Sequence, residues 1–137
     1  MVKKEDRDES QQKLRVVTKS IELMHYTQQI TSNVKVFKPE YNWLTSVILT
    51  ETINIHRLVY SANEDNLKDE FESRNKKQKD ALKLCNNLKA DILVAKKTYH
   101  LRAKRVVYWT NKVNEIKTLI QKWMESDRKR YKELNKS

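Results

Sequence analysis

Apolar residues recur along this chain at the spacing of a helix that buries one face. The clearest run covers residues 106–123, where successive apolar residues are three or four positions apart. Its members are Val106, Trp109, Val113, Ile116, Ile120 and Trp123. A helix turns by about 100° per residue, so this spacing places all of them on the same side. The pattern predicts an amphipathic helix over about 103–131.

Three earlier segments carry a similar pattern and predict helices over about 12–32, 40–62 and 68–97. In the first, the expected core positions are Leu14, Val17, Ile21, Leu23, Met24, Gln28 and Ile30. In the second they are Leu44, Val47, Ile48, Ile55, Leu58, Val59 and Ala62. In the third they are Gln78, Ala81, Cys85, Leu88, Ile92 and Ala95, with Phe71 extending the stripe toward the start of the helix.

The segments between these helices have turn-forming sequences. Residues 31–38 contain Thr, Asn and Val, which weaken helices, and Pro39 suits the first turn of the helix that follows. Asn63 and Asn66 suit a turn and a helix cap. The third connection, around 98–103, is less clearly marked. Short connections make consecutive helices antiparallel neighbours, so we expect an all-α, antiparallel up-down-up-down four-helix bundle.

The composition agrees with a single helical domain. The chain of 137 residues has no glycine and one proline, whereas tight hairpins rely on glycine for positive φ angles. With 38% hydrophobic and 34% charged residues, it is too apolar for a disordered chain and too polar for a membrane protein. We expect one core within 13–131, a mobile charged arm at 1–12 and a basic tail at 132–137.

The sequence predicts neither a membrane span nor an export signal. No apolar run approaches the roughly 18–20 residues that a membrane helix needs. Residues 1–13 mix both charge signs instead of leading into an apolar segment. We therefore expect a cytoplasmic protein that has no membrane partner.

Positive charge is the main indication of function. The chain has 29 Lys and Arg against 18 Asp and Glu, a net charge of +11. The excess gathers in three clusters, and such clusters bind nucleic acid by neutralising phosphates and releasing counterions. A solvated helix face is the alternative for any one cluster. The candidate contacts are Arg74, Lys76, Lys77 and Lys79; Lys96, Lys97, Arg102, Lys104 and Arg105, which are our first choice; and Arg128, Lys129 and Arg130.

The residue types that carry catalysis or hold metals do not come together in the sequence. His25, His56 and His100 fall on three different segments, and no His or Cys pair has the spacing of a metal site. Without glycine, the usual phosphate-binding loops of nucleotide-dependent enzymes are absent. The single cysteine, Cys85, occupies an apolar helical position that suits an inert core thiol. We therefore expect no enzymatic activity, no cofactor and no metal.

The aromatic residues divide between the core and its edges. Trp109 and Trp123 lie on the apolar stripe and are expected in the core. Tyr41, Trp43 and Tyr108 are expected at its edges, to stack on unpaired bases or to fill an interface with another subunit. Polar residues also interrupt the apolar stripes, which favours the subunit interface. These are Gln28, Asn54 and Gln78.

Several short motifs follow one another along most of the chain. They are Thr31-Ser32-Asn33 and Phe37-Lys38-Pro39-Glu40-Tyr41 in the first loop, Ala62-Asn63-Glu64, Arg74 and Gln78 with Ala81-Leu82, Tyr108-Trp109, and Trp123-Met124-Glu125-Ser126-Asp127. In order and spacing they resemble the accessory variability determinant (Avd) proteins of diversity-generating retroelements. That family shares a four-helix-bundle superfamily with the ribosomal-RNA intervening-sequence proteins.

The resemblance implies a non-catalytic accessory protein that assembles as a ring-like homopentamer. Such a protein would bind the reverse transcriptase of the retroelement and its template RNA, with DNA as a second candidate ligand, and would support mutagenic complementary-DNA synthesis. The alternative is a basic, self-associating bundle of the intervening-sequence type, with a structural or general nucleic-acid-binding role and no polymerase partner. A third reading is an antitoxin-like or defence-system accessory component.

Overall fold

The chain folds into four long helices. The computed structural model describes residues 4–136, and this range contains no β-strand. Within it, no helix has the unbroken apolar stretch that crossing a lipid bilayer requires. The elements are α1 (Lys4–Thr31), the 3₁₀ turn η1 (Pro39–Tyr41), α2 (Asn42–Glu64), α3 (Phe71–Tyr99) and α4 (Ala103–Leu134).

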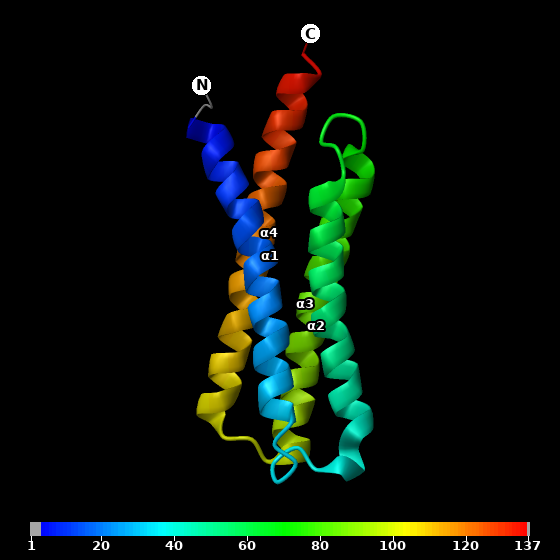
Figure 1. Cartoon of the computed structure of the whole chain (residues 1–137), viewed down its shortest axis with the longest axis vertical. Helices are drawn as coiled ribbons and strands as arrows, with labels where there is room; N and C mark the ends of the chain where they lie inside the picture. Colours follow the sequence, from blue (N-terminus) through cyan, green and yellow to red (C-terminus); the bar gives the residue numbers. More distant parts are fainter. Residues whose placement is uncertain (1–3, 137) are drawn as a thin grey trace.

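Each helix runs antiparallel to the one before it (Figure 1). Helix α1 packs against α2 and α4, and α3 packs against the same two helices from the other side. The helices therefore form a closed up-down-up-down bundle, in which α4 returns beside α1. The start of α1 and the end of α4 lie at the same end of the bundle (Figure 1). The prediction of an all-helical bundle is confirmed.

The helices extend further at both ends of the chain than the apolar pattern indicates. Helix α1 begins at Lys4, so residues 4–12 of the expected arm are helical, whereas residues 1–3 lie outside the described part. Glu, Gln, Lys and Arg dominate this segment and have high helix propensity, so the helix continues without an apolar stripe. Helix α4 likewise runs through residues 132–134 of the expected tail.

The core faces of α3 and α4 follow the predicted stripes closely. All the expected core positions of α4 are buried, including Trp109 and Trp123. Those of α3 are buried from Gln78 to Ala95, whereas Phe71 is half-buried. The Phe71 ring stacks on Tyr131 of α4 at 4.1 Å between centroids. Both helices therefore present one continuous buried face to the bundle interior, which is apolar except near the start of α3 and the end of α4.

In α1 most of the predicted core face is wrong by about one residue, although Leu23 is buried as predicted. The buried positions are Val16, Ser20, Leu23, Thr27 and Thr31. Most of the expected stripe instead lies at the edge of the core, because three polar residues whose hydroxyls are hydrogen-bonded, Ser20, Thr27 and Thr31, occupy the buried face. The half-buried or exposed members of that stripe are Val17, Ile21, Met24, Gln28 and Ile30, and the Leu14 side chain lies outside the described part.

Hydrogen bonds explain why hydroxyl groups are tolerated inside α1. Ser20 Oγ donates to the backbone oxygen of Val17 at 2.7 Å and lies 3.0 Å from His56 Nδ1 on α2. Trp109 Nε1 on α4 donates to Thr27 Oγ1 at 3.1 Å. A buried polar group with a partner costs little, so these residues pack as well as apolar ones. Helix α1 is thus tied to both of its neighbours.

The outer part of the predicted stripe in α2 is also more exposed than expected. Leu44, Ile48, Ile55, Val59 and Ala62 are buried as predicted. Val47 remains 43% exposed and Leu58 is half-buried, because Glu51 and Thr52 take buried positions on this helix instead.

A buried ion pair joins α3 to α4. Arg74 is bidentate to Asp127, with Nε–Oδ2 at 2.7 Å and Nη2–Oδ1 at 2.8 Å, and neither side chain is more than 2% exposed. Gln78 Nε2 donates to the same carboxylate at 2.8 Å, and Arg74 Nη1 donates to the backbone oxygen of Asp65 at 3.1 Å. The guanidinium also lies 5.3 Å from the centre of the Trp123 ring. The cluster fixes the loop between α2 and α3 against α4.

Cys85 lies within the core, as predicted from its place in the stripe of α3. Burial raises the pKa of its thiol to about 12. The thiol therefore stays protonated at neutral pH and packs as a small apolar group.

A second buried acidic group lies between α2 and α3. Glu51 is 8% exposed, and its Oε1 atom has no hydrogen-bond partner within the described residues. Burial, followed by the hydrogen bond and charge of Asp91 on α3, raises the pKa of Glu51 to about 8. The folded protein therefore holds a proton on Glu51 at pH values where the unfolded chain has released it.

Replacing Glu51 with glutamine is expected to reduce the loss of stability between about pH 4.5 and pH 8. In the wild type the free energy of unfolding falls across this window, because the folded state binds more protons than the unfolded state. Urea denaturation at several pH values measures the effect. E51Q should show a flatter profile and greater stability than the wild type at pH 8, and identical profiles would contradict the assignment.

Candidate nucleic-acid interface

Two loops that are far apart in sequence meet at one end of the bundle. Because the helices alternate in direction, the loop between α1 and α2 and the join between α3 and α4 lie at the same end (Figure 1). We call this end, formed by residues 32–41 and 96–105, the basic end. It lies opposite the start of α1 and the end of α4 (Figure 1).

Positive charge dominates the basic end. Its two segments carry one carboxylate, Glu40, and a set of Lys and Arg side chains that are all exposed. The basic residues are Lys35, Lys38, Lys96, Lys97, Arg102, Lys104 and Arg105. The structure thus joins the first-choice cluster at 96–105 to two lysines of the other loop. Clustered cations of this kind create a strong positive potential that attracts polyanions.

The end of α3 positions the basic residues of the second segment. The helix stops at His100, which adopts the left-handed conformation with φ 55° and ψ 48°. The N–H groups of His100 and Leu101 both donate to the Lys96 oxygen, and the buried Leu101 side chain anchors the turn. Arg102 then precedes α4 in an extended conformation. The turn therefore presents the cations on both of its sides to solvent.

The clusters at the opposite end of the bundle are less uniformly basic. Arg74 is wrongly predicted as a phosphate contact, because it is buried and bonded to Asp127. Lys77 Nζ lies 2.9 Å from Asp65, so the acidic loop after α2 neutralises this lysine. Lys76 is exposed but pairs with a carboxylate one turn away, Asp80, at 2.9 Å. Carboxylates therefore lie among these cations. Asp65 is distant from Lys77 in sequence, and Asp80 follows Lys76 by one helical turn.

The C-terminal cluster lies at the same end as the start of α3 (Figure 1). Arg128 and Lys129 are exposed and Arg130 is half-buried. Lys129 lies 3.6 Å from Glu125 within α4. Lys79 of α3 is also exposed at this end. The structure therefore separates the predicted contacts into two groups at opposite ends, of which only the basic end is almost free of acids.

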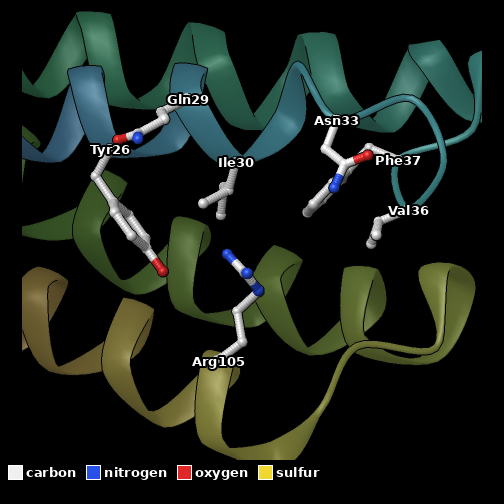
Figure 2. A pocket seen from close by; sticks show the side chains of 7 residues that line it. All are labelled: Tyr26, Gln29, Ile30, Asn33, Val36, Phe37 and Arg105. Atoms are coloured by element: carbon white, nitrogen blue, oxygen red, sulfur yellow. The ribbon is translucent and has the colours of Figure 1, made fainter.

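A cavity opens beside the basic end, between α1 and α4 (Figure 2). Its volume is about 330 Å³. The lining residues are Tyr26, Gln29 and Ile30 from α1, Asn33, Val36 and Phe37 from the following loop, and Arg105 from α4. Arg105 extends from α4 into this space toward α1 (Figure 2). The cavity combines an apolar base with polar and cationic groups.

Tyr26, which lines the cavity, also contacts an aromatic ring and a lysine of α4 that lie outside the lining. Tyr26 packs edge-to-face on Tyr108, with 5.3 Å between ring centroids. Lys112 Nζ lies 5.2 Å from the first ring and 4.9 Å from the second, within the range of cation–π attraction. Burial raises the pKa of Tyr26 above its ordinary value, and nearby Arg105 partly offsets that effect. The Tyr26 hydroxyl therefore stays protonated at neutral pH, with Arg105 as a hydrogen-bonding neighbour.

Several exposed apolar side chains lie at or near the basic end, and others lie along α2, α3 and the end of α4. At or next to the basic end, Val34 is 60% exposed, and Val107 and Tyr108 at the start of α4 are more than half exposed. On the outer surface of α2, Trp43 is 62% exposed and lies one turn from Val47. The prediction that Trp43 and Tyr108 lie outside the core is confirmed. Single exposed apolar residues are common, but such groups favour contacts with a partner.

Comparisons with protein-family models, with curated proteins and with solved structures find nothing that matches this chain.

Sequence reasoning missed the contribution of the first loop and of the end of α1. Lys35 and Lys38 are separate lysines in a loop, and they join a cluster only because the up-down order brings two loops together. The polar residues of the cavity gave no recognisable pattern, since Tyr26, Gln29 and Asn33 follow helical spacing on a surface face. The predicted up-down topology places the first and third connections at the same end, and it could have identified Lys35 and Lys38 as part of the basic end.

Proposed function

We propose that this protein is a non-catalytic RNA-binding accessory protein that holds the RNA backbone at its basic end. The observation that carries the proposal is the meeting of two segments, 32–41 and 96–105, at one end of the bundle. Their exposed side chains include one acid, Glu40, and seven Lys or Arg: Lys35, Lys38, Lys96, Lys97, Arg102, Lys104 and Arg105. Lysine and arginine bind phosphate oxygens through charge-assisted hydrogen bonds, and binding releases the counterions that surround the polyanion.

The accessory role follows from the resemblance to Avd proteins. On that basis the RNA is the template of a diversity-generating retroelement, and the protein partners are its reverse transcriptase and further copies of this chain. Exposed apolar residues near the start of α2 and the end of α3 support a protein contact beside the basic end, because they offer apolar area for burial that phosphate does not use. They are Trp43, Val47, Leu93 and Val94.

Binding of a structured RNA is expected to weaken steeply with salt. The logarithm of the binding constant should fall linearly with the logarithm of salt concentration, with a slope of roughly −4 to −6 if most of the basic residues contact phosphate. Fluorescence anisotropy from about 50 to about 300 mM salt measures the slope, and light scattering gives the mass of the free protein.

Three outcomes separate the proposals. Steep salt dependence together with a pentameric mass supports the retroelement role. Salt-dependent binding by another oligomer keeps the RNA function and argues against the ring. An assembled protein that ignores RNA contradicts the proposed function and favours a self-associating bundle of the intervening-sequence type.

A further inference from the structure

The cavity between α1 and α4 has a chemical character that phosphate binding alone does not use. Ile30, Val36 and Phe37 supply apolar surface, and Phe37 is 3% exposed. Its volume of about 330 Å³ lies in the range of small-ligand pockets, which suits a planar ring with an attached sugar. Arg105 at the start of α4 lines the cavity, and the exposed Lys104 precedes it in the chain. Ligands that join a flat heterocycle to a phosphate match both parts.

We propose that this cavity binds one unpaired nucleobase of the RNA, while the phosphates on either side of it contact the basic end. The proposal rests on the proposed function, because the charge of the basic end selects a polyanion. With such a cavity, the protein distinguishes RNA that has an extruded base from a continuous duplex. A base inside a duplex is stacked and paired, so only an unpaired or extruded base reaches between two helices.

The polar groups of the cavity are arranged to read a base edge. Asn33 Oδ1 accepts the backbone N–H of Lys35 at 3.2 Å, so the Asn33 amide nitrogen remains as a donor. This nitrogen faces the cavity in Figure 2. Arg105 supplies further N–H donors, and the Gln29 carboxamide offers both a donor and an acceptor. Donors thus outnumber acceptors along the polar side.

A donor-rich edge selects bases with carbonyl oxygens. Uracil and guanine present such oxygens on their hydrogen-bonding edges, and arginine pairs well with the O6 and N7 atoms of guanine. Adenine presents an amino group and no carbonyl. Adenine is thus disfavoured, and we assign the cavity to an unpaired base that carries a carbonyl oxygen, such as uracil or guanine, with the Tyr26 ring and Ile30 as its apolar neighbours.

The test uses three RNA hairpins that share one stem. One stem is continuous, one carries a single bulged uridine, and one carries a bulged abasic nucleotide. The wild-type protein is expected to bind the bulged uridine about tenfold more tightly than either of the other two, from the burial of one base. Measurement at fixed salt by fluorescence anisotropy keeps the phosphate contribution constant.

A matched pair of variants locates the effect. Val36→Trp places a large ring in the cavity and leaves every charge in place, whereas Val34→Trp adds the same ring two residues away, outside the cavity lining. V36W should lose the preference for the bulged uridine and keep its affinity for the continuous stem. V34W should retain the preference, and thermal melting checks that both variants fold.

The outcomes distinguish this proposal from the one on which it rests. Equal, salt-dependent binding of all three hairpins by the wild type overturns the base pocket and leaves the RNA function standing. A preference that survives in a folded V36W also overturns the pocket. Failure to bind any hairpin overturns both proposals. Because the first comparison uses the wild type alone, it remains decisive even if V36W does not fold.

Discussion

Replacing Asp127 with alanine is expected to destabilise the protein by about 3–5 kcal/mol. Asp127 is the partner of Arg74 in a pair with almost no solvent exposure, and it also accepts a hydrogen bond from Gln78. The substitution leaves a buried guanidinium and a buried amide without their acceptor, and an unpaired buried charge is costly. The free energy of unfolding, measured by urea denaturation, should fall by this amount.

The control removes the whole polar cluster. In the triple variant Arg74→Met, Gln78→Leu and Asp127→Leu, the interior becomes apolar and no buried charge remains. Exchange of a buried ion pair for well-packed apolar residues is often close to neutral. We therefore expect the triple variant to be more stable than D127A. If D127A loses less than about 1 kcal/mol, the pair is solvated and its described burial is contradicted.

Reversing the charge at Lys104 and Arg105 is expected to weaken RNA binding by about a hundredfold at about 50 mM salt. Each phosphate contact contributes about one logarithmic unit of affinity at that salt concentration, and the double substitution removes two contacts and adds repulsion. The slope of affinity against salt should become shallower by about 1.5. Both side chains are exposed at the start of α4, so the fold should be retained.

A matched control makes the same change in net charge at the opposite end of the bundle. Lys79 and Arg128 are exposed there, on α3 and α4. The double reversal K79E/R128E should alter RNA affinity much less than K104E/R105E. Equal losses for the two variants would mean that overall charge, and not the basic end, determines binding. The two ends of the bundle would then be equally good candidates for the RNA-binding site.

The sequence predicted the architecture well because the helices carry a periodic apolar pattern and glycine is absent. The core faces of α3 and α4 follow from large apolar residues at fixed spacing, such as Trp109 and Trp123. The face of α1 could not be predicted in the same way, because Ser20 and Thr27 are buried with partners on other helices. A periodicity that counts only apolar residues assigns such positions to the surface.

Of the candidate site, only the basic residues that are close together in sequence could be predicted. Runs of Lys and Arg are visible in sequence, and the run at 96–105 lies on the basic end. Whether a cation is solvated, paired or buried depends on its neighbours in space, and this explains the wrong prediction for Arg74 and the neutralised position of Lys77. The cavity depends on a loop conformation that Asn33 helps to set, and no periodic pattern encodes it.

The unequal distribution of charge between the two ends also affects how the protein meets its ligand. A molecule with seven cations and a single carboxylate at one end, and mixed charges at the other, has a large electric dipole along its long axis. The field of a polyanion therefore rotates it during diffusion, so that the loops between α1 and α2 and between α3 and α4 arrive first. Orientation before contact raises the fraction of productive collisions, and association is fastest where salt screens the field least.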